Sequence, residues 1–425
     1  MPLDATLERL YARRRFGIRP GPERVSLLLD RLGRPQDSFR TIHVVGTNGK
    51  GSTAAFLSAI LTAAGHRTGF FSSPHLVRFS ERFRIDGREA GHDELSPLLH
   101  TVLEQAPDDA TFFEIVTALA AFYFSRSRID IAVMEAGMGG ISDATAVLGG
   151  LMTVITPVSL DHCDWLGGTT GQIATEKCRI ARPGTPVLSA RQQPEAAAAV
   201  ADCCRQGDNP LTCIGGELYG AWGADGRLEY HGISGTLSGL TPGIPGRYQA
   251  ENASLALAAS ELLPGCGIAV SAGARRNGIA AARWPGRMEY IDGSPPLLLD
   301  GAHNAAGAAA LAEALEDYSH SRLLLVTGVM EDKDVRSLLA PLAGRVWRAW
   351  AVAPAVERAM PAETLAGHLT ALGVHTQACP DLASGLLAAR TGARPGDLIL
   401  VCGSLFTVGE AKAVLAGEAF TGIRG

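Results

Sequence analysis

Residues 41–64 read TIHVVGTNGKGSTAAFLSAILTAA, a short apolar run, a glycine-rich turn and a longer run with apolar residues at helical spacing. The first run predicts a buried strand, and the residues after Gly51 predict a helix. A helix N-terminus offers unpaired N–H groups and the positive end of its dipole, and glycines let the backbone approach an anion closely. Lys50 adds a full positive charge to the turn. We therefore expect this turn to bind a phosphate.

The turn departs from the usual P-loop pattern. That pattern has a further glycine upstream, where this chain has a valine, and a Ser or Thr directly after the lysine, where it has Gly51. The sequence therefore predicts a variant loop for nucleotide binding. An ordinary glycine-rich turn from strand to helix, with Lys50 on the surface, stays open as the alternative.

The composition predicts two globular domains. A chain of 425 residues exceeds the size at which one core usually stops growing, and 46% hydrophobic with 19% charged residues is typical of globular proteins. A formal net charge of -5 argues against non-specific nucleic-acid binding. We find no apolar run long enough for a membrane span and no signal-peptide core at the start, and expect a cytoplasmic protein. The eight scattered cysteines include no CxxC pair, so we expect reduced thiols.

Polar side chains follow two predicted strands. Glu135 ends the strand predicted over residues 130–134, and Asp161 and His162 come soon after the strand predicted over residues 153–156. In open α/β sheets the carboxyl ends of the strands form the ligand-binding edge. We therefore expect Glu135 to face a metal, with a strand-end salt bridge as the alternative. A lone histidine is more often structural. His162, however, would share this edge of the sheet with the glycine-rich turn of residues 46–52, here called the phosphate loop, which favours a role in the site.

Two other segments of this half matter. Residues 72–90 are polar and irregular, and we expect a functional loop rather than core. Residues 170–181 form a predicted helix that carries Lys177, which taken alone would be a solvated surface lysine.

The rest of the chain changes character twice. Residues 207–245 contain short glycine-rich strands and predict a small β insertion, and a helix follows from Gln249. The tripeptide Trp284–Pro285–Gly286 cannot continue a helix, so we place a domain boundary there. Beyond it strands alternate with helices, which predicts a second α/β unit. Two α/β domains, residues 1–286 and 287–425, suggest a nucleotide held in the cleft with a second substrate against its γ-phosphate.

An ordered series of motifs carries a resemblance to a known family. The series is GTNGKGS, SSPHLVRFSERFRIDG, EAGMGGISDATA, SLDHCDWLG, IATEKCRIAR, WPGRMEYI, LLLDGAHN and VMEDKD. It resembles the folylpolyglutamate synthase family of the Mur ligase superfamily, and most of all its bacterial bifunctional dihydrofolate synthase/folylpolyglutamate synthase members. The resemblance extends from Glu23 to the GSLFTVGEA segment, which is nearly the whole chain.

The resemblance implies a fold and an activity. The fold would be a P-loop-containing Mur-ligase-type central domain plus a smaller Rossmann-like C-terminal domain. The activity would be an ATP-dependent ligase that joins the amine of L-glutamate to the carboxylate of dihydropteroate or to the γ-carboxylate of a folate. In such a reaction the carboxylate first takes the γ-phosphate of ATP, and the amine then displaces phosphate. The resemblance further implies two Mg²⁺ ions and a monomer.

The resemblance also assigns roles to residues of this chain. The phosphates of ATP would be held by Gly49, Lys50, Gly51 and Ser52. The metal ligands would be Ser73, Glu135, His162 and a carbamate formed on Lys177, and the residues closest to the chemistry would be Lys50, His162 and Lys177. Further contacts to ATP would come from Asn252, Arg287, Asp300 and His303. The pteroate pocket would be built from Gly21, Pro22, Phe112, Phe113, Asp143 and Ala144.

The sequence departs from the family pattern at Ala146, where the family usually has Asn, and at Ala305, where it usually has Pro. Ala146 lies beside the expected pteroate pocket, so the acceptor is less closely defined than the ATP chemistry. Four alternatives stay open. They are another ligase of the superfamily, a nucleotide-binding module without chemistry, a P-loop kinase or ATPase, and a synthase that makes only polyglutamates. The first of these would carry a further N-terminal domain, which we do not expect before Gly46.

Overall fold

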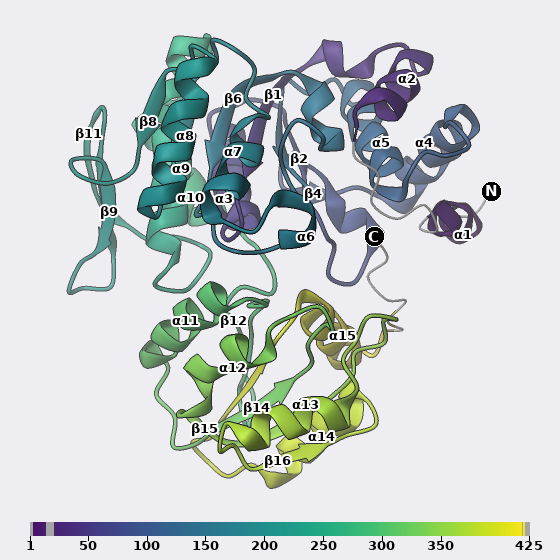
Figure 1. Cartoon of the computed structure of the whole chain (residues 1–425). Coiled ribbons are helices and arrows are strands. Elements are labelled where there is room, and N and C mark those ends of the chain that lie inside the picture. The colour runs from purple at the N-terminus through teal and green to yellow at the C-terminus, as the bar shows by residue number, and fades with distance from the viewer. Residues whose placement is uncertain (1–2, 14–20, 419, 421–425) are drawn as a thin grey trace.

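The computed structural model describes residues 3–13, 21–418 and 420. Figure 1 shows two α/β units, the larger built from the first part of the chain and the smaller from the last part. The larger unit contains an eight-stranded sheet in the order β4-β3-β2-β5-β1-β6-β7-β8. Its strands are β1 Arg40–Val45, β2 Thr68–Phe71, β3 Phe83–Ile85, β4 Arg88–Glu89, β5 Ile131–Glu135, β6 Gly150–Ile155, β7 Val187–Ser189 and β8 Leu211–Cys213. The predicted α/β class is confirmed.

The centre of this sheet is parallel and buried except at the starts of β1 and β6. Strand β1 lies between β5 and β6, and Val44 is paired with Glu135 in register. The strand-to-helix prediction for residues 41–64 is confirmed, since β1 runs into helix α3 (Lys50–Ala63) through the glycine turn. Because β1, β5 and β6 run parallel, their carboxyl ends and the polar residues that follow lie along one edge of the sheet.

Helices cover both faces of the large sheet. The described helices of this unit are α1 Leu3–Tyr11, α2 Glu23–Arg31, α3, α4 His92–Gln105, α5 Phe112–Arg126, α6 Cys163–Leu166, α7 Thr170–Cys178, α8 Pro194–Gln206, α9 Gln249–Leu262 and α10 Ala272–Ala281. Helices α3, α9 and α10 pack on one face, while α2, α4 and α5 pack on the other. Helices α7 and α8 complete that second face beside β6 and β7.

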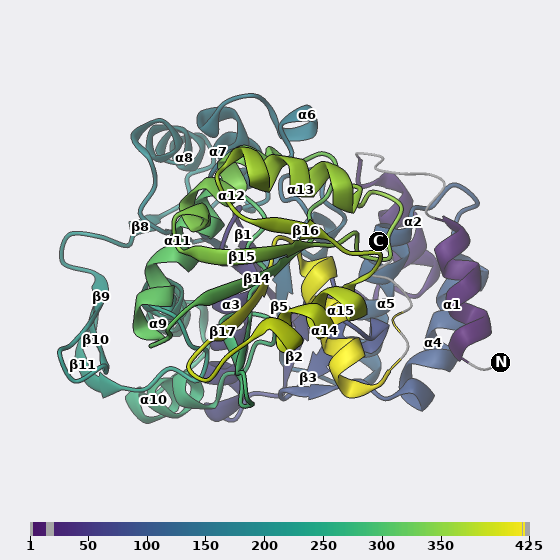
Figure 2. The same ribbon diagram turned by 90° about the horizontal axis from the view of Figure 1, so that it is seen from below.

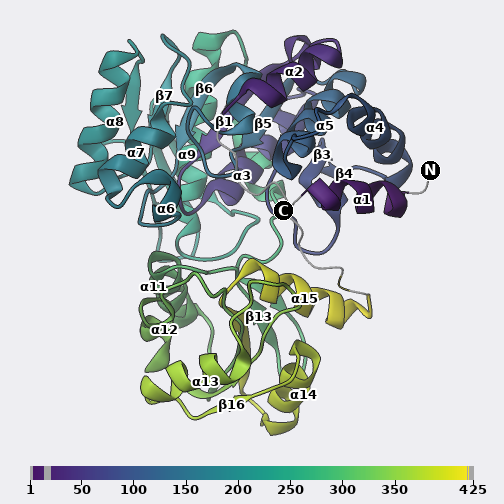
Figure 3. The same ribbon diagram turned by 45° about the vertical axis from the view of Figure 1, so that its right-hand side comes forward.

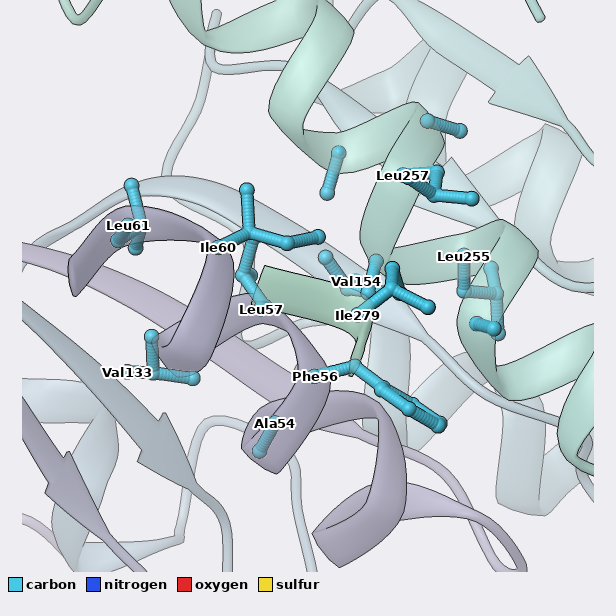
Figure 4. Close-up of a cluster of buried hydrophobic side chains, with 14 of the residues drawn as sticks. Ala54, Phe56, Leu57, Ile60, Leu61, Val133, Val154, Leu255, Leu257 and Ile279 are labelled. Carbon is cyan, nitrogen blue, oxygen red and sulfur yellow. The ribbon is translucent and has the colours of Figure 1, made fainter. Parts of the chain in front are cut away.

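Helix α3 is the centre of the first core. Its side chains Phe56, Leu57 and Ile60 are fully buried against Val133 and Val154 of the sheet and against Leu255 and Ile279 of the outer helices (Figure 4). Helix α10 crosses α3 so closely at Gly278 that a Cβ there would overlap the backbone of Ile60. The helix that begins at the phosphate loop is thus held in place by packing along its whole length.

The predicted β insertion is confirmed. Strand β8 joins the edge of the large sheet, and the strands that follow form a separate antiparallel sheet that stands out from the body of the molecule (Figure 1). These strands are β9 Tyr219–Trp222, β10 Leu228–Gly232 and β11 Gly235–Leu240.

The second unit contains a six-stranded sheet in the order β12-β13-β17-β14-β15-β16, parallel except for β12. Its strands are β12 Glu289–Ile291, β13 Leu297–Leu299, β14 Leu323–Thr327, β15 Val346–Ala351, β16 Thr376–Ala378 and β17 Leu398–Cys402, and its helices are α11 Ala305–Ala314, α12 Val335–Ala343, α13 Ala362–Ala371, α14 Leu382–Gly392 and α15 Leu405–Ala416. Figure 2 shows α11, α12 and α13 on one face of this sheet and α14 and α15 on the other. Helices α11 and α15 lie on the side that faces the larger unit (Figure 3).

One expectation was wrong in part. Residues 72–90 were expected to form a loop outside the core, but β3 and β4 lie within this segment and extend the large sheet. Phe79 and Phe83 are buried in the same cluster as helices α4 and α5. Arg82 of this segment is buried as well, because its guanidinium donates to His75 and lies over the ring of Phe112.

The cysteines of the described residues are free thiols, and four of the eight are buried. None of the described helices combines the length and the apolar character needed to cross a lipid bilayer.

Candidate active site

The turn between β1 and α3 requires glycine at two positions. Gly46 has a φ of +139° and Gly49, the N-cap of α3, has a φ of +84°, both in the region that disfavours other residues. A Cβ on Gly46 would overlap Thr156, and a Cβ on Gly49 would overlap the side-chain oxygen of Asn252. The loop therefore lies tightly against the strand end of β6 and the first turn of α9, with the helix N-terminus directed out of the sheet edge.

Lys50 lies over this loop. Its Nζ donates to the carbonyl oxygens of Gly46 at 3.3 Å and Thr47 at 3.1 Å. The side chain is half-buried, so its charge acts in a region of reduced water content. Ser52, in the first turn of α3, is buried and accepts a hydrogen bond from Gln249 at 3.3 Å.

Glu135 lies at the end of β5, where it was expected. Its carboxylate is 5% exposed and accepts a hydrogen bond from the Ser73 N–H at 3.3 Å. Burial raises the pKa of Glu135, while Lys50, the Ser73 N–H and Arg287 act in the opposite direction. A cation beside this carboxylate would remove the cost of burying it, so the donor set suits a hard divalent ion.

Lys177 is buried rather than a surface lysine. Its side chain, at the end of α7, is 2% exposed, and its Nζ donates to the Met138 carbonyl oxygen at 2.5 Å. Burial and the nearby charge of Lys50 lower its pKa to about 7. A substantial share of this amine is therefore neutral at neutral pH, and a neutral amine is the nucleophilic form.

His162 follows β6 in a left-handed conformation, with a φ of 52°. Loss of hydration lowers its pKa to about 4, helped by the charges of Lys333, Lys50 and Lys177 and opposed by Asp161. Protein atoms surround part of the imidazole, and the rest of the residue is open to solvent at the edge of the site. Among the residues that the structure describes, no three His, Cys, Asp or Glu side chains lie close enough together to hold a metal by themselves. Ser73 and Glu135 are in contact through the Ser73 N–H.

The second unit contributes nitrogen-bearing side chains to this edge. Lys333 donates to Asp161 at 2.8 Å, and the His303 Nε2 lies 3.7 Å from the other oxygen of that carboxylate. Burial would raise the pKa of Asp161, but His303, His162 and Lys333 hold it well below its usual value. Sequence reasoning did not single out Lys333, although it stands in the VMEDKD motif, because only the fold brings it to Asp161.

The two units also meet at the phosphate loop. Asn304 and Asn48 exchange two side-chain hydrogen bonds, at 3.0 and 3.3 Å. Asn252 is buried beneath the loop and donates to Gln249 at 2.8 Å. Asn252 and Asn304, the residue after His303, thus both contact this loop.

Asp300 and Arg287 occupy the junction of the two units. Asp300 is buried at the end of β13 and accepts from the Tyr248 hydroxyl at 2.8 Å and from the N–H groups of Met288 and Ala302 at 3.0 and 2.9 Å. Its carboxylate is thus well satisfied by the protein. Arg287 donates to the Gly286 carbonyl oxygen and lines the cleft with Ser73 and Glu135.

The residues expected in the pteroate pocket gather elsewhere, around the starts of α2 and α5. Gly21 and Pro22 precede α2, Phe112 and Phe113 open α5, and Ala144 begins the short turn η4 (Ala144–Leu148) that packs on α5. Phe112 stacks on Tyr11 with ring centroids 6.0 Å apart.

Asp143 has a structural task in this region. Its carboxylate accepts hydrogen bonds from the N–H groups of Met138, Gly139 and Thr145 at 2.9 to 3.0 Å and from the Thr145 hydroxyl at 2.7 Å. Asp143 thereby fixes the loop whose Met138 carbonyl oxygen accepts from Lys177. It therefore connects the expected pteroate residues with the residues around Lys177.

Comparisons with known proteins agree with this arrangement. The profile of the Mur ligase middle domain matches residues 44–187, and that of the Mur ligase glutamate ligase domain matches residues 286–405. A dihydrofolate synthase/folylpolyglutamate synthase of Escherichia coli is 36% identical over 405 residues, which are 93% of this chain and 91% of that protein. A probable bifunctional folylpolyglutamate synthase/dihydropteroate synthase of Halobacterium salinarum is 36% identical over 427 residues, 97% of this chain. The chain spans about half of that relative, 51% of its length.

Solved structures extend the likeness to three dimensions. The structure of E. coli FolC in complex with DHPP and ADP superposes with a TM-score of 0.90, at 34% identity and with 98% of each chain covered. A bifunctional folylpolyglutamate synthase/dihydrofolate synthase with Mn, AMPPNP and L-glutamate bound superposes with a TM-score of 0.87, at 32% identity and with 98% of each chain covered. Both the resemblance and the Mur-ligase-type fold that it implied are confirmed. The chain belongs to the dihydrofolate synthase/folylpolyglutamate synthase family of Mur ligases.

Proposed function

We propose that this chain is an ATP-dependent ligase that adds L-glutamate to dihydropteroate, to tetrahydrofolate or to both. The observation that carries the proposal is the sheet edge where the phosphate loop, the buried Glu135 and the buried Lys177 meet, opposite Lys333 and Arg287 of the second unit. Relatives named for this activity, and their complexes with ADP, AMPPNP and L-glutamate, support it.

The chemical problem is to bring an anionic carboxylate against the triphosphate of ATP. The loop Gly49–Ser52 would bind the phosphates with its N–H groups at the start of α3, and Lys50 would neutralise the charge that develops on them. The acceptor carboxylate would attack the γ-phosphorus, forming an acyl phosphate and ADP. The amine of L-glutamate would then attack the acyl carbon, and phosphate would leave as the amide bond forms and the amine loses a proton.

Ser73, Glu135 and His162 are the residues that we propose to hold Mg²⁺. Bound Mg²⁺ would reduce the repulsion between the phosphates and the acceptor carboxylate. The raised pKa of Glu135 supports its place in the set. Two ions and a carbamate on Lys177 form a further part of the proposal. The neutral amine of Lys177 would add to carbon dioxide with loss of a proton, which would replace a buried amine by an anion able to help hold the second ion.

The remaining assignments rest on the resemblance to the family. Asn252, Arg287, Asp300 and His303 would contact ATP from the loop and from the second unit. Gly21, Pro22, Phe112, Phe113, Asp143 and Ala144 would hold the pteroate portion of the acceptor, with the aromatic rings of α5 against the pterin. Three further expectations remain predictions. They are a domain boundary between residues 286 and 287, a monomeric state and a cytoplasmic location. A sizing column tests the monomer.

The test is ADP formation with ATP, magnesium and L-glutamate, with dihydropteroate or tetrahydrofolate as acceptor, and the mass of the product. A product heavier by one glutamate on both acceptors supports the bifunctional activity. A product on tetrahydrofolate alone identifies a polyglutamate synthase. ADP formed without glutamate or acceptor would favour the kinase or ATPase alternative instead.

A further inference from the structure

Arg84 is a cation in the cleft that the proposed mechanism does not use. It stands in the middle of β3 and lines the same hollow between the two units as Ser73, Glu135 and Arg287. Its guanidinium lies over the ring of Trp284, with Cζ 5.0 Å from the ring centroid. Such stacking holds a guanidinium in one plane and leaves its N–H edge free to bind.

Trp284 in turn rests on the phosphate loop. A Cβ on Gly51 would lie 2.6 Å from its indole nitrogen, and the ring packs against Phe70 with centroids 5.2 Å apart. Arg84 is therefore fixed one side chain away from the loop that we assign to the phosphates of ATP.

The carboxylates nearest to Arg84 are committed to other donors. Glu81 accepts the N–H groups of Leu76, Val77 and Arg78, and Glu89 accepts from the guanidinium of Arg78 and the hydroxyl of Ser80. Within the described part of the chain, no carboxylate oxygen lies within 4.0 Å of a nitrogen of Arg84. Burial lowers the pKa of Arg84, while the more distant charges of Glu81 and Glu89 act in the opposite direction.

The other arginines of this segment differ from Arg84. Arg78 pairs with Glu89, and Arg88 pairs with Glu94 at 2.8 Å on the surface. Arg82 is buried between His75, to which its Nε donates at 2.8 Å, and the ring of Phe112. Only Arg84 of these four presents its charge to the cleft between the units.

We propose that Arg84 binds a carboxylate of one of the two acid substrates, either L-glutamate or the pteroate-type acceptor. The inference rests on the proposed function. A planar guanidinium with free N–H groups binds a carboxylate through two parallel hydrogen bonds, and here it stands beside the place where both acids must meet the γ-phosphate. The stack on Trp284 fixes the plane of the guanidinium before the substrate binds.

The test compares R84Q, R84K and the control R88Q, which removes an exposed arginine from the neighbouring strand. For each, the KM values for L-glutamate, acceptor and ATP are measured together with the thermal unfolding midpoint. We expect R84Q to raise the KM for one acid about tenfold or more, because hydrogen bonds to charged groups are the stronger class. The KM for ATP should stay within about twofold of the parent. The acid whose KM rises identifies the source of the carboxylate.

A rise confined to the KM for ATP, or no change in either acid, would overturn the inference. A parent chain without glutamate-dependent ADP formation would contradict the proposed function itself, which is a different result. If R84Q does not fold, R84K serves in its place, because lysine keeps the positive charge but lacks the two parallel N–H groups of the guanidinium. We then expect a smaller rise in the KM for the same acid, again with little change in the KM for ATP. Amide analogues of the acid whose KM rises give a second readout, since an amide at the bound carboxylate should cost the parent much more than the variant. Equal losses in the two proteins would also overturn it.

Discussion

Replacing Gly49 by alanine tests the geometry of the phosphate loop. Gly49 has a φ of +84°, and its added Cβ would overlap the Asn252 oxygen. Gly65, just beyond the other end of α3, has a φ of +88° and nothing within 4 Å of its Cβ position. The two alanine variants therefore share the backbone strain, and only Gly49→Ala adds a collision.

The expected magnitudes follow from these contacts. Alanine in the left-handed region costs about 1 to 2 kcal/mol, offset by about 0.4 to 1 kcal/mol from the restricted unfolded chain, so Gly65→Ala should lose about 1 kcal/mol. In Gly49→Ala the buried Asn252 must also move away from Gln249, to which it donates at 2.8 Å. Disturbing a buried hydrogen-bonded amide adds about 1 to 3 kcal/mol, for a total of about 2 to 4 kcal/mol.

Urea unfolding measures the free energies, and calorimetric titration with ADP and magnesium measures the binding. We expect Gly49→Ala to lose at least about tenfold in ADP affinity, because the loop amides shift from the phosphate. Gly65→Ala should bind ADP as the parent does. Equal losses of stability in the two variants, with unchanged ADP affinity in both, would refute this reading of the loop.

Four further predictions concern single residues. Lys50→Ala should lower turnover by orders of magnitude while circular dichroism and the unfolding midpoint stay those of the parent, and near-normal turnover would count against the site. Lys177→Ala should lose activity and regain part of it with added short carboxylates, whereas full activity without them would rule out a carbamate. Phe56→Ala should cost about 3 to 5 kcal/mol of unfolding free energy because the ring is fully buried in the core of α3, and a loss under about 1 kcal/mol would show that the core is packed differently. Burial tends to raise the pKa of Glu89, but hydrogen bonds from Arg78 and Ser80 hold it below its usual value, so its ionised form stabilises the fold above about pH 4.5 and this contribution is lost as the pH falls. Glu89→Gln should thus lose less stability between about pH 5 and 3 than the parent, and an equal loss would contradict the sign.

Local patterns were enough for the framework of the site. The apolar run before Gly46 and the helical spacing after it predicted β1 and α3, and the position of Glu135 at the end of an apolar run predicted its place on the sheet edge. These predictions succeeded because a buried parallel strand reads as a continuous apolar run, and because parallel strands end together.

Long-range pairings could not be predicted in this way. The commitment of Asp143 to three backbone N–H groups, and of Asp300 to Tyr248 and Met288, depends on how distant loops approach each other. A carboxylate at a strand end looks the same in sequence whether it faces a ligand or holds a loop. The burial of Lys177 was likewise hidden, because a lysine near the end of a helix is usually solvated.

The ligase activity is the central claim, and one measurement tests it most directly. The chain is incubated with ATP, magnesium, L-glutamate and either dihydropteroate or tetrahydrofolate, and ADP is followed together with the product mass. We predict ADP formation that requires both glutamate and acceptor, with a product heavier by one glutamate residue. ADP formation that ignores both acids, or no reaction with either acceptor, would contradict the proposed function.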